Sequence, residues 1–203
     1  MEKKGTVYGG SIGISAVIII IVVSIGASYI LINRGAGPSG TSGGTGETVS
    51  LTDITLSEAV TRAKSDATAR GYTDAQLTYN VSAANFTRDG KASWSIKLFS
   101  SSRNAEISYA STGFEFVMEN ASSMQLLTSF ADSSQIASNN QEIWSFADNQ
   151  QSSTVTTLID TYLGGIAPYH GNKAWKITVT YGPPTDREST NWWVAISTGV
   201  KIS

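Results

Sequence analysis

The chain has 203 residues, a formal net charge of -2 and no cysteine. This charge gives no basic footprint for nucleic acid, and the missing thiols exclude disulfides, Cys-ligated zinc, iron–sulfur clusters and thiol catalysis. Only 15% of the residues are charged, against a typical value of about 25%. Ser, Thr, Asn and Gln replace them, which is typical of a surface exposed in the cell envelope.

Residues 12–32 form an apolar segment in the uncharged stretch between Lys4 and Arg34. At about 1.5 Å per residue, a helix of this length spans about 31 Å, close to the thickness of a bilayer's hydrocarbon core. We therefore predict a short N-terminal segment at 1–11, a transmembrane signal-anchor at 12–34, and membrane lipid as a partner. A cleavable secretory signal, a prepilin-type leader cut near Gly5 and a buried core helix are the alternatives.

Two lysines, Lys3 and Lys4, precede the apolar segment and one arginine, Arg34, follows it. The positive-inside bias then places the N-terminus in the cytoplasm and the C-terminal domain outside a cell membrane that the chain crosses once. Three sequons agree with this topology and make Asn80, Asn85 and Asn120 possible N-glycosylation sites. The alternative is that these asparagines are ordinary polar strand or turn residues.

Residues 35–46 read GAGPSGTSGGTG and predict a flexible linker. A Gly/Ser-rich coil of twelve residues has an end-to-end distance of about 19 Å. No Lys-Ser or Lys-Thr follows the glycines, so the run is no phosphate-binding loop. The linker therefore tethers the domain to its anchor.

The next segment, 47–120, predicts a helix followed by strands. Thr55 and Glu58 fit a capping box, apolar residues from Leu56 to Ala67 recur at helical spacing, and Gly71 stands where the helix should stop. Alternating apolar residues then predict strands, among them one led by Trp94 and one containing Ile107 and Tyr109. The class is α+β.

The second half, 121–203, repeats parts of the first. A strand led by Trp94 is echoed by one led by Trp175, and the Ser-Thr-Gly turn before Phe114 is echoed before Val200. The offsets are 175 − 94 = 81 and 199 − 113 = 86, so we place five extra residues in the loop at 182–190. We infer a tandem duplication, with a second helix at 154–163 ended by Gly164, and leave 122–150 unplaced.

A helix, a Trp-led strand and a strand ending in Ser-Thr-Gly resemble the PepSY/cystatin-like unit. The resemblance covers about 51–118, and 173–203 through the strands alone. It implies two small units, 47–120 and 121–203, each with a helix packed across an antiparallel sheet. It also implies an inhibitory or regulatory role toward peptidases or envelope components, without catalysis.

The residue types predict no catalytic site, metal site or cofactor. His170 is the only histidine, and its setting between Tyr169 and Gly171 predicts a turn. A His-based triad needs a nucleophile and an acid converging on it, and no serine lies in a nucleophile-elbow motif. A glycosidase with two distant carboxylates stays open as an alternative.

One surface patch is predicted from adjacent tryptophans, which point to opposite faces of a strand. The 86-residue offset aligns Trp193 with Ile107, and so places Trp192, Val194 and Ile196 on the outer face as a partner-binding patch. The alternative is that residues 122–146 or the other unit cover this face.

Two functions follow. The first is a membrane-anchored extracytoplasmic binding or regulatory module whose partner is an envelope or extracellular protein, without nucleic acid. The second is a structural subunit of a filament, surface layer or virion, in which the apolar helix associates with copies of itself. Gly5, Gly9, Gly10 and Gly13 would allow such close helix contacts.

Overall fold

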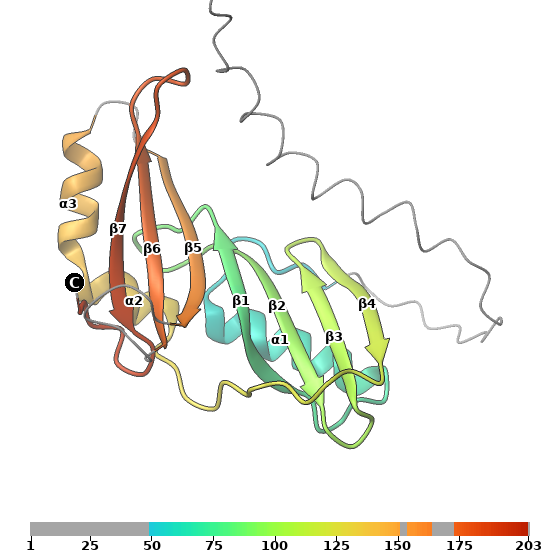
Figure 1. Ribbon diagram of the computed structural model, residues 1–203. Helices are drawn as coiled ribbons and strands as arrows, with labels where there is room; N and C mark the ends of the chain where they lie inside the picture. The colour runs from blue at the N-terminus through green and yellow to red at the C-terminus, as the bar shows by residue number, and fades with distance from the viewer. Residues whose placement is uncertain (1–48, 151–153, 164–172, 203) are drawn as a thin grey trace, which may run out of the picture. The chain divides into compact units, whose positions relative to one another are not determined.

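The computed structural model describes residues 49–150, 154–163 and 173–202 (Figure 1). These belong to one compact unit, Gly46–Ser203, and form an α+β fold with two antiparallel sheets. The elements in chain order are α1 (Leu56–Ala69), β1 (Gln76–Ala84), β2 (Ser93–Ser100), β3 (Ala105–Ala110), β4 (Gly113–Glu119), α2 (Ser133–Asn139), α3 (Gln141–Asn149), β5 (Thr154–Leu163), β6 (Lys173–Tyr181) and β7 (Glu188–Ala195). The first sheet has the order β1-β2-β3-β4 and the second β5-β6-β7.

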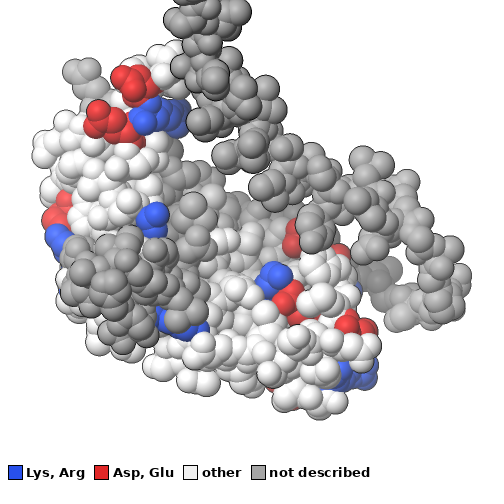
Figure 2. All heavy atoms as spheres, in the orientation of Figure 1, with Lys and Arg blue, Asp and Glu red and all other residues white. Residues whose placement is uncertain are grey.

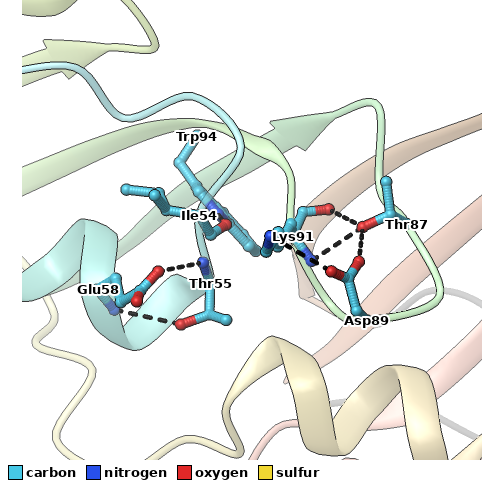
Figure 3. A network of polar contacts seen from close by, with 7 residues as sticks. All are labelled: Ile54, Thr55, Glu58, Thr87, Asp89, Lys91 and Trp94. Carbon is cyan, nitrogen blue, oxygen red and sulfur yellow. Dashed lines mark hydrogen bonds and ion pairs between the residues drawn. The ribbon is translucent and has the colours of Figure 1, made fainter.

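Helix α1 begins and ends where the sequence predicts. The Thr55 hydroxyl accepts from the backbone N–H of Glu58 at 3.4 Å, and the Glu58 carboxylate accepts from the N–H of Thr55 at 3.1 Å (Figure 3). Gly71 follows the last turn with φ +90°, a conformation that a Cβ disfavours. The predicted capping box and stop are confirmed.

The face that α1 buries packs on one side of the four-stranded sheet. Its members are Leu56, Ala59, Val60, Ala63 and Ala67, the apolar set of the sequence pattern. Opposite them the alternating residues of β2 and β3 are also buried: Trp94, Ile96, Leu98, Ile107 and Tyr109. The indole N–H of Trp94 donates to the carbonyl of Ile54 at 2.8 Å, so this large side chain has no unpaired polar atom (Figure 3).

The helix predicted at Thr154–Leu163 is wrong, because this segment is strand β5. Its sequence, TVTTLIDTYL, is rich in β-branched residues, which lose rotamer freedom in a helix and pack well on a pleated sheet. It pairs with β6 from Thr154↔Thr180 to Leu163↔Lys173. The helices of the second half are instead α2 and α3, within the segment that the sequence left unplaced. At the start of α2, the Gln135 side chain accepts from the N–H of Asp132 at 3.1 Å.

The strand register corrects the alignment of the repeat. Ile96 lies opposite Tyr109 in the first sheet, and Ile177 lies opposite Trp192 in the second. The offsets are 177 − 96 = 81 and 192 − 109 = 83, so the paired strands differ by two residues rather than five. Because 86 and 83 differ by an odd number, the predicted alignment assigned every residue of β7 to the wrong face.

Both sheets share one hydrophobic core. The buried cluster includes Trp94 and Ile107 of the first sheet, Ile136 of α2, and Trp175 and Ile177 of the second sheet. Strands β1 and β5 lie side by side (Figure 1). The two sheets therefore fall in the predicted segments 47–120 and 121–203. The hydrophobic core is continuous between these segments.

Polar contacts also join the first helix to the second half of the chain. The N–H of Leu56 donates to the Ser133 hydroxyl and the N–H of Ser57 to the Asp132 carboxylate, both at 2.8 Å. The start of α2 thus satisfies two of the N–H groups that the first turn of α1 leaves free. Near this junction the rings of Phe86 and Trp144 lie 5.6 Å apart.

We expect Gly90→Ala to lower the free energy of unfolding of the 46–203 unit by about 2–4 kcal/mol. Gly90 has φ +80°, and a Cβ there would lie 2.3 Å from the backbone N and Cα of Ser134. Gly71→Ala is the matched control, since it adds backbone strain at φ +90° but meets only the Arg103 side chain, at 3.2 Å. Urea denaturation followed by circular dichroism measures both, and equal losses would contradict the close packing of Gly90 on α2.

The predicted anchor at 12–34 and linker at 35–46 lie outside the described residues. Within the ranges that the structure describes, no helix is long and apolar enough to span a bilayer.

Candidate functional site

One face of the four-stranded sheet packs on α1, and no described helix covers the other, which we call the open face (Figure 1). Side chains alternate across a strand, so the residues between the core positions point to this face. They include Asn80, Ser82, Ser95, Lys97, Phe99, Glu106, Ser108, Phe116 and Met118, of which Phe99 is a buried apolar residue. Charged side chains are sparse over β1–β4 in the space-filling view (Figure 2).

An ion pair lies in the middle of the open face. The Lys97 ammonium is 2.6 Å from a carboxylate oxygen of Glu106, and the two side chains are 39% and 3% exposed. A buried carboxylate is costly without a partner, so Lys97 is held in place as the counter-ion of Glu106. The pair leaves the centre of the face with little net charge.

Hydroxyl and apolar groups surround this pair. Ser108 of β3 pairs with Lys97 on the neighbouring strand β2 and with Phe116 on the neighbouring strand β4. The Ser108 hydroxyl is buried and has no hydrogen-bond partner among the described residues. Phe116 and Met118 are the exposed apolar members, at 48% and 47%.

Two hollows indent this face, and Lys97 borders the first of them. The first hollow, of about 290 Å³, is bordered by Asn80, Ser82, Ser95, Lys97, Ser108 and Glu115 among others. The second hollow, of about 400 Å³, shares Asn80 with the first and extends past Glu106 and Met118 to Lys173. Burial lowers the pKa of Lys173, whose ammonium lies 3.3 Å from the centre of the Tyr79 ring.

The predicted patch of Trp192, Val194 and Ile196 is not a surface. These side chains are 7%, 0% and 9% exposed, and the Trp192 ring lies 5.1 Å from that of Phe146 on α3. Trp192 and Val194 lie opposite Ile177 and Trp175, so they share the core face of their sheet. The alternative interpretation, in which residues 122–146 cover this face, is correct.

All three sequon asparagines are exposed, but they lie in different settings. Asn80 is in strand β1 at the edge of both hollows. Asn85 and Asn120 have φ of 59° and 55°, so they occupy the left-handed region that asparagine tolerates better than most residues. Glycosylation stays a prediction, and a structural turn role accounts for Asn85 and Asn120 equally well.

The sequence of β2 contains a signal for the open face. Ser95 and Lys97 are the polar members of the alternating strand whose apolar members are Trp94, Ile96 and Leu98. The burial of Glu106 had no such signal, because a single strand does not show that a lysine nine positions earlier lies beside it.

Most side chains that border the two hollows carry hydrogen-bonding groups. Among the described residues, no three His, Cys, Asp or Glu side chains gather as a metal site would require. His170 lies outside the described residues. Comparisons with protein-family models, curated proteins and solved structures find no match, so the proposal below rests on the geometry of the site.

Proposed function

We propose that the chain is a membrane-anchored, non-catalytic binding module that presents its open face to a component of the cell envelope. The observation that carries this proposal is the open face itself, where two exposed apolar side chains lie among polar ones and one of them, Met118, borders the second hollow. Phe116 and Met118 are half exposed on a sheet whose opposite side is fully used by the core. Exposed apolar groups rimmed by polar ones are typical of interaction surfaces.

The anchoring part of the proposal comes from the sequence. The apolar segment at 12–34 and the Gly/Ser-rich linker at 35–46 would hold the 46–203 unit close to the external surface of the cell membrane. The N-terminus would lie in the cytoplasm. Residues from Gly46 to Ser203 form one compact unit, which supports a boundary between the anchoring segments and the binding domain near Gly46.

The PepSY-like assignment belongs to the same proposal. A helix packed on a four-stranded antiparallel sheet, as α1 packs on β1–β4, is compatible with the unit that the resemblance implies for 51–118. We infer from it a regulatory role, in which binding to a peptidase or another envelope component changes that component's activity.

A test is photo-crosslinking in native membranes, with the full-length chain carrying benzoylphenylalanine at one position. We expect a discrete adduct from position 116 or 118 on the open face. The matched controls are positions 200 and 202, where Val200 and Ile202 are 51% and 45% exposed in the segment after β7. The adduct should disappear in a Ser95→Ala/Asn80→Ala background and persist with Ser65→Ala on the exposed side of α1.

Equal adducts from all four positions, or adducts from 200 and 202 alone, would contradict the assignment of the open face. An adduct at 116 with a second copy of the chain, together with filaments after detergent extraction, would instead favour the structural-subunit hypothesis.

A further inference from the structure

We propose that the first hollow binds one neutral sugar residue of an envelope glycan. This inference rests on the proposed function and names the ligand class of the same face. It follows from the kinds of side chain that border the hollow, from its place on the sheet and from its size.

Most groups around the first hollow are uncharged, and its one bordering carboxylate, Glu115, would repel an anionic ligand. Asn80, Ser82, Ser95 and Ser108 each donate and accept hydrogen bonds, as sugar hydroxyls do. The one ammonium group, that of Lys97, is paired with Glu106 at 2.6 Å. A ligand carboxylate or phosphate would compete with Glu106 for this cation, and would leave a buried carboxylate unpaired. A neutral ligand avoids this cost.

Ser108 supplies the second, independent feature. Ser108 is 2% exposed and borders the hollow, and its buried hydroxyl lacks a hydrogen-bond partner among the residues described. A buried polar group without a partner is destabilising, so such a group in a recess indicates that a ligand supplies the missing bond. Phe116 does not border the hollow itself, but it lies opposite Ser108 on β4 and is 48% exposed, so its ring is available to the C–H side of a sugar that extends beyond the hollow.

The position on the sheet favours a sugar over an extended peptide. Peptides that add to sheets bind at an edge, where main-chain N–H and C=O groups are free. The hollow lies over the paired strands β1–β4 rather than along a free edge, although the pairing is irregular between Leu77 and Val81 and at Ser108–Tyr109. Its volume of about 290 Å³ is at the lower end of the range for small-molecule sites and suits a single ring.

The second hollow adjoins the first at Asn80, so a longer glycan would continue past Glu106 toward Met118. Asn80 also begins a sequon, and a sugar attached to it would compete for the same space. The binding experiment therefore needs protein made in a host without N-glycosylation.

Saturation-transfer NMR and titration calorimetry test the proposal on the full-length chain in micelles of a detergent without a sugar headgroup. The probes are the methyl glycosides of glucose, galactose, mannose and N-acetylglucosamine, with glucuronate as the charged comparison. We expect at least one neutral glycoside to bind and glucuronate to bind more weakly. Ser108→Ala and Asn80→Ala should each weaken binding about threefold to tenfold, the value of one or two hydrogen bonds.

The variants are chosen so that folding and binding separate. Ser108→Ala removes a hydroxyl without a partner, so it should leave the unfolding midpoint unchanged or slightly raised. Ser65→Ala on α1 should change neither measurement. Absence of binding by all four neutral glycosides would overturn the sugar proposal, and so would affinities in the Ser108→Ala and Asn80→Ala variants that are unchanged from the unsubstituted chain. If position 116 still crosslinks to an envelope component in that case, the binding-module proposal stands and only the ligand class is wrong.

Discussion

Trp94→Ala and Trp175→Ala are each expected to lower the free energy of unfolding of the 46–203 unit by about 3–5 kcal/mol. Both indoles are fully buried, near the starts of β2 and β6 in the two sheets. Truncation leaves a large cavity in a core that the two sheets share. Urea denaturation followed by circular dichroism gives both values from one series of variants.

Phenylalanine substitutions separate packing from hydrogen bonding at the same positions. The Trp94 indole N–H donates to Ile54, whereas that of Trp175 has no partner among the described residues. Trp94→Phe should therefore cost about 1 kcal/mol more than Trp175→Phe. An alanine variant with an unchanged free energy of unfolding at either position would contradict the shared core. Equal losses of stability in the two phenylalanine variants would contradict the hydrogen bond from Trp94 to Ile54.

Trp192→Ala is the second substitution for which we expect a large loss, again about 3–5 kcal/mol. The sequence placed Trp192 on an outer face, but it packs against Phe146 of α3 and lies opposite Ile177. Denaturation of the 46–203 unit measures the loss. Val200→Ala is the matched control, since Val200 is 51% exposed and its truncation should change stability by less than about 0.5 kcal/mol.

An unchanged free energy of unfolding in the Trp192→Ala variant would contradict the packing of Trp192 against α3. It would instead favour the predicted surface patch. A loss of stability without any loss of crosslinking at position 116, among the molecules that remain folded, would agree with a purely structural role for Trp192.

Local signals predicted the first half of the fold well. Helix α1 has a capping box, an apolar face and a glycine at its end, three signals that agree with one another. The strands around Trp94 and Ile107 alternate apolar and polar residues along much of their length, because one face of their sheet packs on α1 and the other carries mainly polar side chains.

The second half was harder because its signals conflict. The segment TVTTLIDTYL has ten residues and a glycine after it, which also fits a short helix, and only the pairing with β6 decides for a strand. Helices α2 and α3 have seven and nine residues, too short for a strong periodicity. The face of Trp192 depended on register, where an error of an odd number of residues exchanges core and surface.

The candidate site was only partly predictable. Polar positions in β2 indicated a solvent-facing side of the sheet, but the Lys97–Glu106 pair and the Ser108 hydroxyl come together across strands. A hollow forms where short side chains on adjacent strands lie among longer ones. The sequence of a single strand does not specify this arrangement.

Hydroxyl-radical footprinting of the full-length chain in its native membrane tests the central claim, that the open face is the binding surface. Phe116 and Met118 are 48% and 47% exposed in the structure, and Val200 and Ile202 are 51% and 45% exposed away from that face. We predict that Phe116 and Met118 are oxidised more slowly in the membrane than in purified protein, while Val200 and Ile202 keep the same rates. Unchanged rates at Phe116 and Met118, or protection confined to Val200 and Ile202, would contradict it.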